Sequence, residues 1–332
     1  MTLTNVGFPG RAVRRLAAWC CLGLISLCLS PAVAQTYPSK PMRIVIPFAA
    51  GGSTDILGRT IASHLERRFS VPVYVENRPG GATVVGAMAV AKAEPDAHTL
   101  LLASDTTYAI NPHVLLNTAF DPIKELAPVS VIGNAPNWIV VAENSKYRDF
   151  ASFVQDVREN PGKVSASVNS IGGQVHLVLN AWARRNNLDL TIVPYPGVAR
   201  AVPDLMGGNL SAICDVVGGT ARYVEDGKMR ALALFQAAPS DLVKTPSYTE
   251  SGQKDLDIVT SFVMFTTAGS KQADIDRVSA EIAAILKEPE VAAKLRTLAI
   301  SPVGLNPAQS SAFVLRENAR FGKIVAETGF KL

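Results

Sequence analysis

The stretch "PFAAGGSTD" at positions 47–55 carries two glycines, two hydroxyl side chains and one carboxylate, but no Lys, Arg, His or Cys. Glycine lets a backbone N–H approach an oxyanion without a Cβ atom in the way. Ser53 and Thr54 offer hydroxyl donors, and a helix that begins here would add the partial positive charge of its N-terminus. These features predict an anion-binding site (an anion seat). The alternative is a plain turn with a helix cap.

The carboxylate of this stretch needs a separate explanation, because Asp55 would repel an anion if it faced one. We expect Asp55 to cap the helix or to accept a hydrogen bond from an ammonium or hydroxyl group of the ligand. A nucleotide-binding P-loop is excluded because no Gly-Lys-Ser/Thr follows. The ligand contacts predicted in this loop are Phe48, Ala50, Gly51, Gly52, Ser53, Thr54 and Asp55.

A second loop, "SIGGQ" at 170–174, repeats the design of a strand, a Gly-Gly turn and a helix. Two such turns that face each other would bring two helix N-termini to one cleft, since ligands in open α/β sheets bind at the carboxyl ends of strands. Polar residues near other strand ends could line the same cleft. The further candidate contacts are Ser104, Thr106, Thr107, Asn169, Gly172, Gly173, Gln174, His176, Tyr195 and Asp215.

Catalysis is the rival class of function. The histidines at 64, 98, 113 and 176 have no metal-like spacing, so no metal site is predicted. No Gly-x-Ser-x-Gly elbow occurs, and a trio of Ser53, His176 and Asp215 is one that any large protein could offer. We predict no catalytic residue and no cofactor, and we expect His64 and His98 at the surface.

The elements that must position these residues alternate between strand and helix. Apolar strand-like runs at 42–48, 71–77 and 99–104 are separated by helical patterns, which predicts a parallel sheet covered on both faces. Two further strands are expected at 128–134 and 138–144. A second series of strands and helices begins near 150, and three helices follow residue 272.

The length of 332 residues fits about two domains. The 32 Lys and Arg exceed the 28 Asp and Glu, but three arginines lie in the first 34 residues, which leaves 29 basic against 28 acidic. No basic stripe interleaved with aromatic residues occurs, so nucleic-acid binding is not expected. Cys214 is the one cysteine outside the first 34 residues, and we expect a buried, inert thiol there.

The N-terminal 34 residues have the pattern of a signal peptide. Arg11, Arg14 and Arg15 precede an apolar run at 16–29, and Ala32-Val33-Ala34 forms a cleavage site before Gln35. The alternative is a retained anchor helix, for which the run is short. We therefore expect export and a mature chain in the periplasm that begins at Gln35.

Eight stretches, in order, resemble the periplasmic solute-binding proteins of tripartite tricarboxylate transporters, also called the Bug family. They include "YPSKPMRIVIPFAAGGSTDILGR", "VENRPGGATVVGA", "AKAEPDAHTLLLAS", "DPIKELAPVS", "VPYPGVARAVPDLMGG" and "GKMRALAL". The sequence departs from the family in the second loop, where Gly173 stands in place of a hydroxyl residue, and at Pro196.

The resemblance implies an α/β fold of the two-domain, type II periplasmic-binding-protein (Venus-flytrap) class with a central cleft. Domain 1 would comprise 35–138 and 258–332, and domain 2 would comprise 139–257. It also implies a monomer that captures a small organic carboxylate for the membrane subunits of a tripartite tricarboxylate transporter. The alternatives are a ligand sensor that feeds a signalling partner and a periplasmic enzyme.

Overall fold

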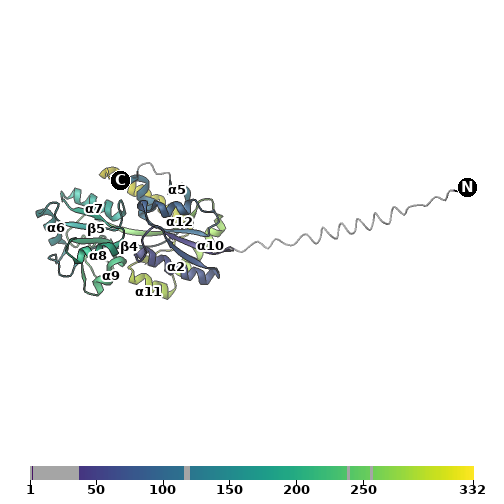
Figure 1. Ribbon diagram of the computed structural model, residues 1–332, viewed down its shortest axis with the longest axis horizontal. Helices are drawn as coiled ribbons and strands as arrows, with labels where there is room; N and C mark the ends of the chain where they lie inside the picture. The colour runs from purple at the N-terminus through teal and green to yellow at the C-terminus, as the bar shows by residue number, and fades with distance from the viewer. Residues whose placement is uncertain (1, 3–36, 116–119, 238–239, 255–256) are drawn as a thin grey trace. The chain divides into compact units, whose positions relative to one another are not determined.

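The computed structural model describes Thr2 and residues 37–115, 120–237, 240–254 and 257–332 (Figure 1). By their backbone contacts, residues 40–332 form one compact unit, to which the described residues 37–39 do not belong. Apart from Thr2, the expected signal peptide with its three cysteines lies outside the described residues. The fold below is that of residues 40–332.

One half of this unit, called here the first lobe, contains the strands that come early in the chain and two strands from its C-terminal part. Its strands are β1 (Met42–Ile46), β2 (Val73–Asn77), β3 (Thr99–Ser104), β9 (Val259–Thr267) and β10 (Ser301–Pro302). Its longer helices are α2 (Ser53–Phe69), α3 (Val84–Ala91), α10 (Gln272–Ile285), α11 (Pro289–Thr297) and α12 (Pro307–Thr328). The short helical segments are η1 (Gly81–Thr83), the π-helix η2 (Thr106–Ile110), α4 (Asn111–Val114) and α5 (Pro122–Glu125).

The second lobe repeats the alternation of strand and helix. Its strands are β5 (Ser165–Val168), β6 (Thr191–Pro194), β7 (Ala212–Val216) and β8 (Met229–Leu234). Its helices are α6 (Phe150–Glu159), α7 (Gln174–Arg185), α8 (Val198–Met206) and α9 (Val217–Glu225). Figure 1 shows these four helices around β5, at the opposite end of the unit from α2 and α10.

The strand β4 (Leu126–Ala142) belongs to both lobes. Its residues 126–136 pair with β9, and its residues 137–142 pair with β7 and β8. The strands form one sheet in the order β2-β1-β3-β9-β4-β7-β5-β6, and β8 and β10 also pair with β4. The expectation of two separate strands here was wrong, because the chain between them, at 135–137, stays extended and fully paired.

The sheet is mixed, not purely parallel as expected. β1 pairs in parallel with β2 and β3, and β5 pairs in parallel with β6 and β7, as the strand–helix alternation predicts. β9, however, runs antiparallel between β3 and β4. β4 carries the chain from the first lobe to the second, and β9 brings it back. β9 therefore runs in the direction opposite to that of β4.

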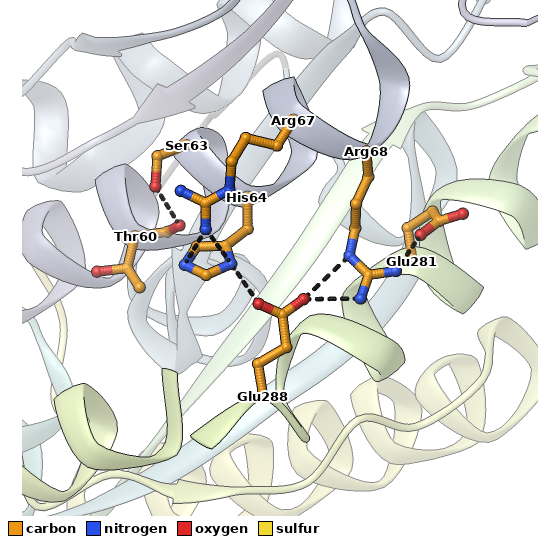
Figure 2. Close-up of polar contacts among 7 residues, drawn as sticks. All are labelled: Thr60, Ser63, His64, Arg67, Arg68, Glu281 and Glu288. Atoms are coloured by element: carbon orange, nitrogen blue, oxygen red, sulfur yellow. Dashed lines mark hydrogen bonds and ion pairs between the residues drawn. The ribbon is translucent and has the colours of Figure 1, made fainter. Parts of the chain in front are cut away.

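The helix that leaves the first glycine-rich loop is fastened at its far end. Nδ1 of His64 on α2 lies 2.7 Å from an oxygen of Glu288, and Arg68 pairs with Glu281 at 2.8 Å and with Glu288 at 2.7 Å (Figure 2). The expectation of surface histidines was wrong: His64 is 3% exposed and His98 is 7% exposed. Glu288, the residue before α11, lies against His64 here, so the corner between α10 and α11 covers the imidazole.

Candidate functional site

The first glycine-rich loop lies between buried strand β1 and the N-terminus of α2. Gly52 is the residue before the helix, in an extended conformation, and no side chain caps the helix there. Gly51 has φ +86°, a left-handed conformation that glycine adopts without the steric cost of a Cβ atom. Ala50 and Gly51 are exposed, whereas Ser53, Thr54 and Asp55 are buried.

The carboxylate of Asp55 accepts hydrogen bonds from its own loop and from the residues beside that loop. One oxygen accepts from the Gly51 N–H at 2.9 Å and from Arg59 Nε at 3.1 Å, and the other accepts from Asn77 Nδ2 at 3.0 Å. Burial raises the pKa of Asp55, but these donors outweigh burial and hold the pKa below its ordinary value. Asn77 also donates to the Phe48 carbonyl at 3.1 Å, so an ionised Asp55 fixes the path of the loop.

Ser53 differs from Asp55 because its buried hydroxyl oxygen has no hydrogen-bond partner among the described residues. A Cβ atom built on Gly218 of α9 would lie 2.9 Å from this oxygen and 2.9 Å from the carbonyl oxygen of Leu298. The first turn of α2 therefore lies directly against the first turn of α9, which belongs to the other lobe. A buried hydroxyl without a partner is uncommon in native structures and needs an explanation.

The second glycine-rich loop connects β5 to α7. Gly173 precedes the helix without a side-chain cap, and a Cβ atom on it would lie 3.3 Å from Thr106 Oγ1 in the first lobe. The two lobes thus approach each other here as well. Gln174 donates to the Val259 carbonyl at 2.9 Å and accepts from Thr260 Oγ1 at 3.0 Å, so its amide faces strand β9.

His176 also has structural partners. The Gly172 N–H donates to its Nδ1 at 3.0 Å, and the ring of Phe330 packs edge-on at 5.0 Å between centroids. Burial lowers the pKa of His176, which favours the neutral imidazole that this bond requires. His176 therefore holds the loop from within the protein.

The polar run that ends β3 divides into two orientations. Thr106 faces Gly173, as described, and Ser104 is 6% exposed. The side chain of Thr107 is fully buried and points toward η1 instead, where it donates to Thr83 Oγ1 at 2.9 Å. The segment from Thr106 is a π-helix, a rare form that is frequent at functional sites.

Between these residues lies Asp105, a buried carboxyl that the sequence reasoning passed over. It accepts from Tyr108 Oη at 2.8 Å and from the Ser261 N–H at 2.7 Å. Burial raises the pKa of Asp105 to about 7, against the opposing effect of both donors. No basic side chain of the described residues forms an ion pair with it.

The remaining candidates line a narrow crevice in the second lobe. Asn169 Nδ2 donates to Asp215 Oδ1 at 2.6 Å, and Tyr195 donates through its hydroxyl to Asp204 at 2.7 Å. The crevice is too narrow to hold a water molecule, and it also touches Gly197 and the buried thiol of Cys214. Burial raises the pKa of Asp215 to about 6, although Asn169 and the Val216 N–H oppose this rise.

Four helices from both lobes begin close to these loops without side-chain caps. They start after Gly52, Gly173, Gly197 and Val216, which precede α2, α7, α8 and α9. A Cβ on Gly197 would lie 3.7 Å from Ala49 of the first loop. No acidic side chain occupies the first turn of α7, α8 or α9, whereas α5, α6 and α12 are capped by Asp121, Asp149 and Asn306.

This arrangement can bind an anion. The first N–H groups of a helix have no partner within it, and the helix dipole places partial positive charge beside them. Two of the four ends, those of α7 and α8, have no acidic group beside them, whereas Asp55 lies in the first turn of α2 and the Asp215 carboxyl lies against the first turn of α9. Within the described parts of the chain, no cluster of His, Cys, Asp and Glu could hold a metal ion.

The sequence matches the family model described as "Tripartite tricarboxylate transporter family receptor" over residues 57–330. The chain belongs to this family. The resemblance stated from the eight sequence stretches is therefore confirmed, and the receptor's fold is the two-domain fold of periplasmic binding proteins.

Relatives and solved structures agree with this assignment. The receptor is 29% identical to Protein BugT of Bordetella pertussis over 305 residues, which cover 91% of this chain and 94% of BugT. A structure described as a periplasmic transporter superposes with a TM-score of 0.84 at 29% identity, covering 89% and 99% of the two chains. "R. palustris Rpa4515 with adipate" gives 0.83 at 26% identity with the same coverage, and BugD gives 0.83 at 25%.

BugD is described as a periplasmic binding protein. Among the described residues of the receptor, no helix has both the length and the apolar character needed to cross a bilayer. Sequence reasoning missed Gly197, Gly218 and Asp105. Gly197 carried a usable signal, because "TIVPYPGVAR" also reads as a strand, a glycine turn and a helix. Gly218 and Asp105 carried none, since their importance lies in contacts with Leu298 and Ser261, which are distant in the sequence.

Proposed function

We propose that the receptor captures a small organic carboxylate between its lobes and delivers it to the membrane subunits of a tripartite tricarboxylate transporter. The observation that carries this proposal is that the uncapped N-termini of three second-lobe helices lie against the first lobe: those of α8 and α9 against the first glycine-rich loop and that of α7 against Thr106. The solved structure of Rpa4515, 26% identical to this chain, is one with adipate. A dicarboxylate on a protein of the same fold supports the same ligand class here.

The proposed contacts are the N–H groups at the starts of α2 and α7, with Ser53 and Thr106 as hydroxyl donors. A micromolar Kd corresponds to about 8 kcal/mol. Charge-assisted hydrogen bonds contribute about 1.5–3 kcal/mol each, and a helix end contributes up to about 2 kcal/mol. Four or five such bonds, less the entropy of association, reach this range without an arginine.

The structure suggests different roles for the other predicted contacts. Asp55, Thr107, Gln174 and His176 make hydrogen bonds within the protein that shape the loops. Asn169, Tyr195 and Asp215 line the crevice, where we propose that they contact the end of the ligand farther from α2. Phe48, Ala50, Gly51, Gly52, Thr54, Ser104, Gly172 and Gly173 complete the proposed surface.

The test is native mass spectrometry of the purified receptor, followed by calorimetric titration with linear mono- and dicarboxylates of about three to six carbons. We expect a released carboxylate or saturable binding of at least one compound. Small-angle scattering should then show a smaller radius of gyration with ligand, because two lobes joined by β4 and β9 can close. A protein stripped of ligand that binds none of these compounds would overturn the carboxylate assignment.

We also propose that the receptor is exported and begins at Gln35, acts as a monomer, and divides into 35–138 with 258–332 and 139–257. Intact mass of the protein from the periplasmic fraction tests the first point, since a retained 1–34 segment or a lipid adduct would contradict it. Co-purification with the membrane subunits tests the delivery step, and turnover of the bound carboxylate would favour an enzyme instead.

A further inference from the structure

The two strands that connect the lobes carry an unusual set of buried polar side chains. The start of β9 pairs with β4, with Val259 opposite Pro136 and Thr260 opposite Ala135. Three consecutive residues of β9 are bound here by side chains of other segments. Gln174 binds Val259 and Thr260, Asn137 binds Thr260, and Asp105 binds the N–H of Ser261.

Three of these side chains form a directional chain of hydrogen bonds. Asn137 Nδ2 donates to Thr260 Oγ1 at 2.9 Å, Thr260 Oγ1 donates to Gln174 Oε1 at 3.0 Å, and Gln174 Nε2 donates to the Val259 carbonyl at 2.9 Å. Asn137 also donates to the Ile258 carbonyl at 3.0 Å. All three side chains are buried, so water cannot readily replace a lost partner.

Gln174 and Asp105, which both bind this segment of β9, stand next to the residues at which the lobes approach each other. Gln174 follows Gly173 directly, and Asp105 precedes Thr106 directly. Gly173 and Thr106 are the two positions that approach each other between the lobes. The distance between them therefore depends on how Gln174 and Asp105 hold the same short segment of β9.

We propose that Gln174, Thr260 and Asn137 are positioning residues that hold the N-terminus of α7 in the closed arrangement of the lobes. Gln174 thus acts on strand β9 and not on the ligand. The proposal deepens the proposed function in its ligand-binding part and rests on it there, but its claim about the lobes stands without any ligand.

One feature of the network limits its strength. The Oδ1 atom of Asn137 is buried and has no partner among the described residues. An unpaired buried acceptor disfavours the state that contains it. The closed arrangement is therefore held by the Thr260 bonds and opposed by this unpaired oxygen, which leaves a balance that a ligand can shift.

The test removes the central hydroxyl and measures the distance between the lobes. Thr260→Val keeps the shape of the side chain but breaks two bonds of the chain. Thr266→Val is the matched control, because Thr266 is also on β9, is fully buried, and donates to the Thr99 carbonyl at 3.0 Å within the first lobe. Thr260→Ser restores the hydroxyl.

Spin labels on Glu66→Cys in α2 and Glu225→Cys in α9 report the lobe distance, since both positions lie toward the ends of helices in different lobes and Cys214 is buried. Without ligand, we expect Thr260→Val to move the distance distribution toward longer values, with Thr266→Val and Thr260→Ser like the parent. With adipate as the probe, dissociation from Thr260→Val should be about tenfold faster, as expected for about 1.4 kcal/mol of lost stabilisation of the closed state. Association should change less than about twofold, because related complexes differ mainly in their dissociation rates.

An unchanged distance distribution in Thr260→Val, or an equal change in Thr266→Val, would overturn the proposal. Failure of the parent to bind adipate or any carboxylate of the panel would contradict the proposed function alone. The ligand-free distances would still decide whether the three side chains position α7.

Discussion

The two glycine-rich loops look alike in the sequence but are held in place in different ways. In the first lobe, Asp55 binds Gly51, Arg59 and Asn77, all within 22 residues of itself. In the second lobe, Gln174 binds β9, which lies 85 residues away and joins the lobes. The conformation of the first loop therefore does not depend on how the lobes are arranged. The position of the second loop, in contrast, depends on the strands between the lobes.

The same contrast appears in the buried carboxyls beside the loops. Asp55 has a basic partner in Arg59 and a lowered pKa. Asp105 has two neutral donors, no ion pair among the described residues, and a raised pKa. Hydrogen bonds and Arg59 favour the ionised form of Asp55, whereas burial favours the protonated form of Asp105.

Blocking the first seat should have the largest effect. Gly52→Val should abolish detectable ligand binding, a loss of more than about 4 kcal/mol or about three powers of ten in Kd, because its side chain would occupy the place proposed for the anion. The fold should persist, since Gly52 has the extended φ −81° and ψ 171° that valine favours, and only Ala49 O lies within 4 Å of a Cβ there. Calorimetric titration and thermal melts together test this; a folded variant that binds like the parent would place the anion elsewhere.

Asp105→Asn should have a large effect on stability with a defined dependence on pH. The pKa of Asp105 is raised to about 7 in the folded state, so its stabilising protonation is complete below the unfolded value of about 4 and is lost as pH rises through about 7. Asparagine stays neutral and can accept from Ser261 while donating to Tyr108. At pH 8 the free energy of unfolding of Asp105→Asn should be about 2–4 kcal/mol higher than that of the parent, so the variant is the more stable protein, given about 1.4 kcal/mol per pKa unit.

Urea denaturation at about pH 5 and about pH 8 measures this difference. The advantage of Asp105→Asn should grow with pH, whereas Asp55→Asn should destabilise the protein at the higher pH because it removes an ionised group that three donors hold. Equal shifts at both pH values for Asp105→Asn would show that Asp105 is not protonated preferentially in the folded state.

Ser53→Ala separates ligand binding from folding in the first loop. Its buried hydroxyl has no described partner, so removing it should leave the free energy of unfolding of the ligand-free protein unchanged or slightly higher. Binding of a carboxylate should weaken by about 1–3 kcal/mol, the contribution of one hydrogen bond to a charged group. Calorimetric titration and melts of Ser53→Ala test both the weaker binding and the unchanged stability. The control is Ser63→Ala, at an exposed serine on the same helix.

The sequence was sufficient for features that repeat locally. Alternating strand and helix patterns located β1, α2, β5 and α7 and placed both glycine turns at strand ends. The family resemblance supplied the two-lobe fold. Local pattern could not supply the antiparallel direction of β9 or the continuity of β4, because both depend on how the chain crosses between lobes.

Side-chain roles in the site were harder to predict for the same reason. A Gln after two glycines reads as a ligand contact until Val259 and Thr260 are seen beside it, and nothing in "SIGGQ" indicates a partner 85 residues away. Asp55 was expected to cap α2 or bind the ligand, and its partner Asn77 lies at the end of a strand that only the fold brings alongside. Gly51 and Gly52 look equivalent in sequence, but only Gly51 has a positive φ.

That last difference gives the smallest effect and a matched pair to measure it. A Cβ atom built on Gly51 has no neighbour within 4 Å, and one built on Gly52 meets only Ala49 O at 3.9 Å, so alanine at either position causes no steric clash. Gly51→Ala should nevertheless lower the free energy of unfolding by about 1–2 kcal/mol, because its φ of +86° is costly for any residue with a Cβ. Gly52→Ala should change it by less than about 0.5 kcal/mol, since its backbone is already in a region that alanine favours. Denaturant melts of the two variants without ligand decide the matter, and equal losses would mean that the first loop relaxes and is not the fixed seat described above.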